Sequence, residues 1–122
     1  MRPQALITTT VQRRGEIVVV TVNGGEIDMA SAPTLRWAIH EVMSQGVTAL
    51  VIDLSKVAFL ASVGLMVLLS TQERLADARR FAVVADGAVA RPIHLTRLDE
   101  VISLRPTLDE AISCLQDRGF SS

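Results

Sequence analysis

The sequence predicts an α/β protein with a mixed, mainly parallel β-sheet, an N-terminal antiparallel hairpin and about four helices. Three observations lead to this fold class. Short runs of β-branched residues recur along the chain, segments with apolar residues at helical spacing separate the later runs, and a short polar segment joins the first two. Strands that alternate with helices are typical of βαβ units, in which the strands lie parallel.

Length and hydropathy favour one soluble domain over residues 1–122. A chain of 122 residues lies within the usual single-domain range and can bury most of a core. Apolar residues make up 49% of the chain, yet no apolar run reaches the roughly 18 residues of a membrane span. Threonines and arginines interrupt the segment 1–16 where a secretory signal would be apolar, so we expect a cytoplasmic protein without membrane contact.

Charge and cysteine content exclude other classes of function. Twelve basic and thirteen acidic residues give a net charge of −1, and the arginines form no large cluster, so we expect no nucleic-acid partner. Cys114 is the single cysteine, and His40 and His94 lack metal-ligand spacing. No phosphate-binding glycine motif and no nucleophile with a matching base are evident, so we expect no cofactor, no metal and no enzymatic activity.

The strands follow from runs of apolar and β-branched residues. Segments 5–11 and 16–22 are separated by the polar turn segment QRRG, which predicts an antiparallel hairpin. Segments 48–54 and 80–86 are apolar without alternation, as in strands covered within a sheet. A last short strand is expected near 101–104.

Two helices have clear start signals. The first is expected from Ser31, a capping residue, with Pro33 in the first turn and Gly46 past the end. Trp37 falls off its apolar stripe, so we expect Trp37 to be partly exposed. The last helix begins with a T-x-x-E capping box formed by Thr107 and Glu110. The two apolar stripes consist of Leu35, Ala38, Ile39 and Val42, and of Leu108, Ala111, Ile112 and Leu115.

A further helix is expected over 62–78, with Ser62 as its N-cap. At about 100° per residue, its core side consists of Leu65, Leu68, Leu69, Leu75 and Ala76. The opposite side begins with Val63, Met66 and Val67. An outward apolar patch indicates either another element packed over it or a protein-binding surface.

Three blocks of the chain resemble the STAS domain of bacterial anti-sigma factor antagonists. VIDLSKVAFLASVGLMVLL (51–69) is similar to the family pattern D-L-S…V-x-F-x-D-S-S-G-L with its leucine-rich helix. GGEIDMASAPTLRWAI (24–39) is similar to G-E-[IL]-D…L-R, and IHLTRLDEVISLRPTLDEAI (93–112) to the C-terminal L-x-x-[TS]-G-L-D…TLEEAL block. The blocks occur in the family's order and span nearly the whole chain, which implies a single STAS domain.

The resemblance implies a regulatory switch. In this family an anti-sigma factor, a serine kinase with a histidine-kinase-like ATPase fold, phosphorylates a serine that corresponds to Ser62. The unmodified antagonist binds the anti-sigma factor and frees a sigma factor, and the phosphorylated form releases its partner. The chain departs from the pattern at three positions: Ala61 replaces an acidic residue, Val63 replaces a second serine, and Arg97 replaces a glycine.

Two accounts of Ser62 stay open at this point, a helix cap and a phosphorylation site. The resemblance also places Asp28, a turn residue by spacing, on the kinase-facing surface. The candidate partner-binding residues are Asp28, Ser62, Val63, Met66 and Val67. We expect a monomer or weak dimer whose partner is the kinase-like anti-sigma factor, with a serine phosphatase as a candidate second partner. The alternative is a STAS-type sensor or scaffold for a small molecule or nucleotide.

Overall fold

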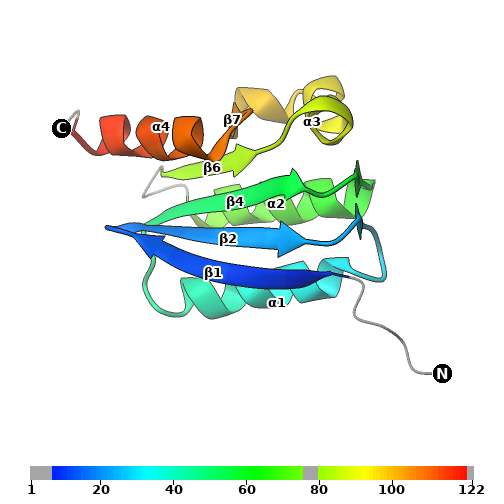
Figure 1. The fold of residues 1–122 in the computed structure, drawn as a ribbon, viewed down its shortest axis with the longest axis horizontal. Coiled ribbons are helices and arrows are strands. Elements are labelled where there is room, and N and C mark those ends of the chain that lie inside the picture. The colour runs from blue at the N-terminus through cyan, green and yellow to red at the C-terminus, as the bar shows by residue number, and fades with distance from the viewer. Residues whose placement is uncertain (1–6, 76–79, 121–122) are drawn as a thin grey trace.

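The computed structural model describes residues 7–75 and 80–120, and these form one central sheet with helices on both faces (Figure 1). The strands are β1 (Thr8–Arg14), β2 (Ile17–Asn23), β3 (Glu26–Ile27), β4 (Ala49–Lys56), β5 (Phe59–Leu60), β6 (Phe81–Val84) and β7 (Ser103–Arg105). The helices are α1 (Ala32–Met43), α2 (Ser62–Arg74), α3 (Gly87–Leu95), the short 3-10 helix η1 (Leu98–Glu100) and α4 (Leu108–Phe120).

The main sheet has five strands in the order β1-β2-β4-β6-β7. Strands β1 and β2 pair antiparallel, with Val11 opposite Val20. The pairs β2-β4, β4-β6 and β6-β7 are parallel. The predicted mixed, mainly parallel sheet with an N-terminal hairpin is therefore confirmed.

Two apolar cores lie on the two faces of this sheet. Alternate residues of β2, β4 and β6 pack with α1, α2 and α3 on one face, and the intervening residues pack with α4 on the other. Figure 1 shows α1 and α2 together behind the sheet. Because β4 is covered on both faces, its first six residues are all buried, which explains the absence of alternation in its sequence.

The predicted helix stripes are confirmed on α1 and α4. Leu35, Ala38, Ile39 and Val42 are buried, as are Ala111, Ile112 and Leu115, whereas Leu108 is half-buried against the same core as the other α4 residues. The backbone amide of Glu110 donates to the Thr107 hydroxyl at 3.2 Å, as expected for half of a capping box. The predicted role of Ser31 is wrong in one respect: Ser31 occupies the N-cap position of α1, but its side chain makes no cap hydrogen bond.

A second, two-stranded sheet was not predicted. It consists of β3 and β5, which pair parallel with Glu26 opposite Phe59 and Ile27 opposite Leu60. Two-residue strands are too short to show a periodic pattern, and their pairing joins distant parts of the chain. This small sheet matters because it connects the segment before α1 to the segment before α2.

Arg97 has a left-handed backbone conformation, with φ 62 and ψ 21, directly before η1. This is the position at which the family pattern has glycine, which adopts this conformation without a Cβ penalty. Arg97 also forms an exposed ion pair with Glu100, with Nε and Oε2 2.8 Å apart.

Backbone strain at Arg97 leads to a testable expectation. Arg97→Val should lower the free energy of unfolding by about 1 kcal/mol, because β-branched residues tolerate the left-handed region poorly. Arg97→Gly should leave stability unchanged or raise it, since the exposed ion pair contributes little. Urea unfolding measures both variants, with Arg91→Val on α3 as the control for adding valine at an exposed position. Equal losses for Arg97→Val and Arg97→Gly would show that the ion pair, not the backbone, determines the effect.

Candidate functional site

The small β3-β5 sheet builds the candidate site. Ala61 follows β5, and its amide donates to the carbonyl of Ile27 at 2.9 Å. The amides of Ala58 and Phe59 donate to the carbonyl of Gly25. These bonds hold the turn after β3 beside the start of α2, so Asp28 and Ser62 lie at the same end of the molecule although they are far apart in sequence.

Ser62 is the first residue of α2, not its N-cap. The N-cap is Ala61, with φ −80 and ψ 170 in the extended region, and no side chain caps this helix. The N-cap prediction for Ser62 is therefore wrong by one position. Ser62 is exposed, and its hydroxyl has no hydrogen-bond partner among the described residues. The serine therefore does not cap the helix, and its hydroxyl is accessible from solvent.

Gly64 explains how the first turn of α2 packs against the small sheet. A Cβ atom at Gly64 would collide with the side chain of Leu60 and would lie 3.0 Å from Cγ2 of Ile27. Both side chains are buried, so neither can move away freely. The glycine therefore allows the close approach that places Ser62 beside the turn after β3.

Asp28 and Ser31 fix the conformation of that turn. Asp28 Oδ1 accepts hydrogen bonds from the amides of Ala30 at 3.0 Å and Ser31 at 3.1 Å. The buried Ser31 hydroxyl donates to the carbonyl of Glu26 at 2.7 Å and accepts from the amide of Asp28 at 2.9 Å. Because Ser31 is held by these bonds, it is not free to cap α1. Asp28 has the turn role that its spacing predicted and is half-buried at the edge of the site.

The predicted outward patch on α2 is partly wrong. Val67 is only 2% exposed and belongs to the main core. The reason is that α2 contacts α1, α3 and β5, so its buried arc is wider than one apolar stripe. Val63 is half-buried and packs against the same core. Leu65 and Leu69, expected in the core, are also half-buried, and Ala76 lies outside the described residues.

Three large apolar side chains remain exposed around the start of α2. They are Met66 at 63%, Phe59 at 53% and Met29 at 82% exposure. Of these, only Met66 was predicted. Phe59 could have been recognised from its alternation with the buried Leu60, and Met29 from its place directly after Asp28. We call Met29, Phe59, Ser62 and Met66 the α2-start surface.

Other polar residues singled out in the sequence have structural roles or lie in solvent. Asp53 is buried within β4, and its Oδ1 accepts a hydrogen bond from the backbone amide of Ser55 at 2.9 Å. His40 and His94 are exposed, and His94 Nδ1 lies 2.8 Å from Asp99 Oδ2. Within residues 7–75 and 80–120, no group of three acidic, histidine or cysteine side chains is arranged to hold a metal ion. None of the helices described is long and apolar enough to cross a bilayer.

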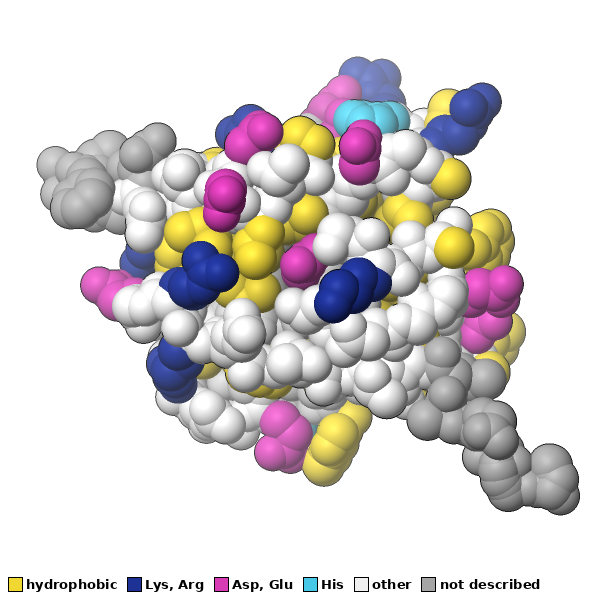
Figure 2. Space-filling view, in the orientation of Figure 1, with side chains coloured by type: hydrophobic (Ala, Val, Ile, Leu, Met, Phe, Trp, Pro, Cys, Tyr) yellow, Lys and Arg dark blue, Asp and Glu magenta, His cyan; other side chains and the backbone are white. Residues whose placement is uncertain are grey.

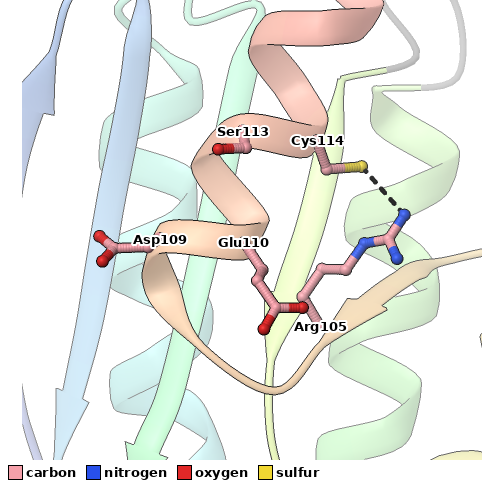
Figure 3. A pocket seen from close by; sticks show the side chains of 5 residues that line it. All are labelled: Arg105, Asp109, Glu110, Ser113 and Cys114. Atoms are coloured by element: carbon pink, nitrogen blue, oxygen red, sulfur yellow. Dashed lines mark hydrogen bonds between the residues drawn. The ribbon is translucent and has the colours of Figure 1, made fainter.

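A separate hollow of about 360 Å³ lies beside the first turns of α4. Its lining includes Arg105, Glu110 and Cys114, with the Arg105 guanidinium 3.5 Å from the Cys114 sulfur (Figure 3). The hydrogen bond to Cys114 is the main cause that raises the pKa of Arg105, and the electrostatic interactions with Cys114 and Glu110 act in the same direction, while desolvation opposes them. The face that carries α4 shows charged side chains of both signs scattered among uncharged ones (Figure 2).

A comparison with models of protein families identifies the family of this chain. The model of the STAS domain matches residues 8–111. The chain belongs to the STAS domain family. It is 47% identical over 108 residues to the anti-sigma-F factor antagonist RsfB of Mycobacterium tuberculosis, and the match covers 88% of each chain. The resemblance found in the sequence is therefore confirmed.

Solved STAS structures share the fold. A crystal structure of an anti-sigma factor antagonist from Mycobacterium paratuberculosis has a TM-score of 0.88 and 48% identity, covering 96% of this chain and 100% of that one. The phosphorylated form of the Bacillus cell fate determinant SpoIIAA has a TM-score of 0.66 and 20% identity, over 88% and 99% of the two chains. At that identity the second likeness concerns the STAS fold alone.

Proposed function

We propose that the protein is an anti-sigma factor antagonist that binds an anti-sigma factor through the α2-start surface and thereby releases a sigma factor. The observation that carries this proposal is the exposed Ser62 hydroxyl without a partner among the described residues, next to the exposed Met66, at a site built by the β3-β5 sheet. Its 47% identity to a named anti-sigma-F factor antagonist supports the same function. Exposed apolar side chains beside a polar switch residue are typical of a protein-binding surface.

The partner in this proposal is a kinase-like anti-sigma factor that phosphorylates Ser62. A phosphate adds about −1.5 to −2 charges at neutral pH. At the start of a helix, free amides and the helix dipole favour an anion, so the modified domain stays folded. In the complex, by contrast, the phosphate has to lose water beside Met66, which opposes binding. Phosphorylation therefore switches the interface without unfolding the protein.

The departures from the family pattern leave fewer serine hydroxyls that could accept a phosphate. Val63 occupies the position of the second serine and is half-buried. Ser62 is thus the single hydroxyl in the first turn of α2. The family pattern has an acidic residue directly before the acceptor serine, and this chain has Ala61 there. The proposal therefore implies a kinase that does not require a carboxylate at this position.

The wider role follows from this interaction. We place the protein in the cytoplasm, where a sigma factor acts, as a single STAS domain over residues 1–122 that is a monomer or weak dimer. A serine phosphatase that removes the phosphate from Ser62 would restore binding. The proposed action is reversible protein binding, without an enzymatic step by this chain and without nucleic acid or membrane as a partner.

Phosphate mapping tests the proposal. After incubation with its anti-sigma factor and ATP, mass spectrometry should find one phosphate on Ser62, and Ser62→Ala should remove it. Ser55→Ala, which removes another exposed serine, is the control and should leave phosphorylation unchanged. Ser31 and Thr71 are buried and should not react. A phosphate at Ser55 or at any other residue, or no phosphate at all, would contradict the assignment.

A further inference from the structure

The single tryptophan of the chain lies on the surface. Trp37 is 64% exposed on α1, although the chain has only three phenylalanines and no tyrosine with which to fill its core. Exposed large apolar side chains mark interaction sites when they belong to a shaped surface, and tryptophan is enriched among the residues that dominate binding energy.

Trp37 lies in a shallow groove of about 430 Å³. Pro33, Arg36, Trp37 and His40 line it from the outer side of α1, and Arg74 contributes from the last turn of α2. The indole and the His40 ring have centroids 6.0 Å apart and are tilted by 31°. These rings and Pro33 give the groove an apolar wall that the core of the domain does not use.

The charged arginines that line the groove have no ionic partner among the described residues. Neither Arg36 nor Arg74 forms an ion pair or side-chain hydrogen bond with any described residue. Other arginines do find carboxylates: Arg80 pairs with Glu16, and Arg97 with Glu100. Two guanidinium groups that have no partner in the described part of the chain, next to an exposed indole, complement a ligand that has carboxylates and one apolar side chain.

We propose that this groove is a second protein-docking site, which binds an acidic partner segment that carries an aromatic or aliphatic side chain. A single-stranded nucleic acid would also offer anions and flat rings. It is disfavoured because the described residues that line the groove include two arginines, too few for the row of phosphate contacts that holds a nucleic-acid strand.

The groove is separate from the α2-start surface. Arg74 closes the helix that Ser62 opens, so the two residues are about 18 Å apart along the axis at 1.5 Å per residue. Docking in the groove therefore does not require Ser62, and it goes beyond the proposed function. A partner held there would still be bound whether or not the phosphate is present.

The fluorescence of Trp37 tests this proposal without the anti-sigma factor. The probe is a synthetic twelve-residue peptide with glutamates and a single phenylalanine, which adds no indole. Titration should give a saturable change in emission. A matched peptide with glutamine in place of each glutamate should bind at least tenfold more weakly. The double variant Arg36→Ser/Arg74→Ser should lose at least tenfold in affinity, whereas Arg91→Ser, at an exposed arginine on α3, should bind like the parent.

Four results would overturn the docking site. They are no saturable change up to millimolar peptide, equal binding of the glutamine peptide, an equal loss with Arg91→Ser, and tighter binding of a twelve-nucleotide oligo-dT. Ser62→Glu should leave peptide binding unchanged, and a loss there would show that the groove is part of the α2-start surface. Failure of the peptide titration would leave phosphorylation of Ser62 untouched, so the two proposals fail separately.

Discussion

Leu68→Asp is expected to unfold the domain, whereas Met66→Asp leaves it folded. Leu68 is fully buried in the main core, where an aspartate would be a charge without a partner. The cost is several kcal/mol, a large share of the roughly 5–15 kcal/mol by which a native domain is stable. Met66 is 63% exposed, so its replacement keeps the carboxylate in water. Circular dichroism in increasing urea measures the unfolding midpoint of each variant.

Val67→Asp tests whether Val67 is buried, which helical periodicity alone does not predict. Counting residues around α2 puts Val67 next to Met66 on the outer side, but Val67 is 2% exposed. It should therefore behave like Leu68→Asp and unfold. If Val67→Asp stays folded, Val67 does not belong to the core. If Met66→Asp unfolds as readily as Leu68→Asp, Met66 is not an exposed residue of α2.

Met66→Asp should also weaken binding of the anti-sigma factor by 1 to 2 kcal/mol, about 5- to 30-fold, on the scale of interface hot spots. Val11→Asp is the control for adding a carboxylate at an exposed apolar residue, because Val11 lies on the edge strand β1. Isothermal titration calorimetry measures both. An equal loss for both variants would point to net charge as the cause.

The main sheet was predictable because local composition determines it. The runs that became β2, β4 and β6 are apolar and β-branched over several residues, and the stripes on α1 and α4 repeat at helical spacing. The β3-β5 sheet was not predictable from the residues, since each strand has two residues and the pairing depends on tertiary contacts. The relation between Asp28 and Ser62 came from the family resemblance, and this pairing supplies its physical basis.

In α2, helical periodicity does not correctly predict which side chains are buried. A stripe predicts one buried side, but α2 contacts α1, α3 and β5, so Val67 and Thr71 are buried too. The N-cap was predicted at Ser62, one residue too late, because the actual N-cap, Ala61, has no side-chain hydrogen-bond acceptor by which the sequence could reveal it. That one position changes the interpretation of Ser62 from a bonded cap to an exposed hydroxyl.

Phosphorylated Ser62 should bind the anti-sigma factor at least 100-fold more weakly than the unmodified protein, with an unchanged fold. Ser62 is exposed and has no hydrogen-bond partner among the described residues, so a phosphate disrupts no such contact within the domain. A loss of 100-fold corresponds to about 2.7 kcal/mol, which is within the cost of desolvating a doubly charged group beside apolar side chains. Calorimetry measures affinity, and thermal unfolding monitors the fold.

Two variants make this prediction specific. Ser62→Ala should bind as the unmodified protein does and should no longer respond to ATP, because the acceptor is absent. Ser62→Glu should weaken binding less than phosphate, since one carboxylate carries about half the charge. If the phosphorylated protein loses its cooperative thermal transition, the switch acts through unfolding. If it binds as tightly as before while remaining folded, the α2-start surface does not contact the anti-sigma factor.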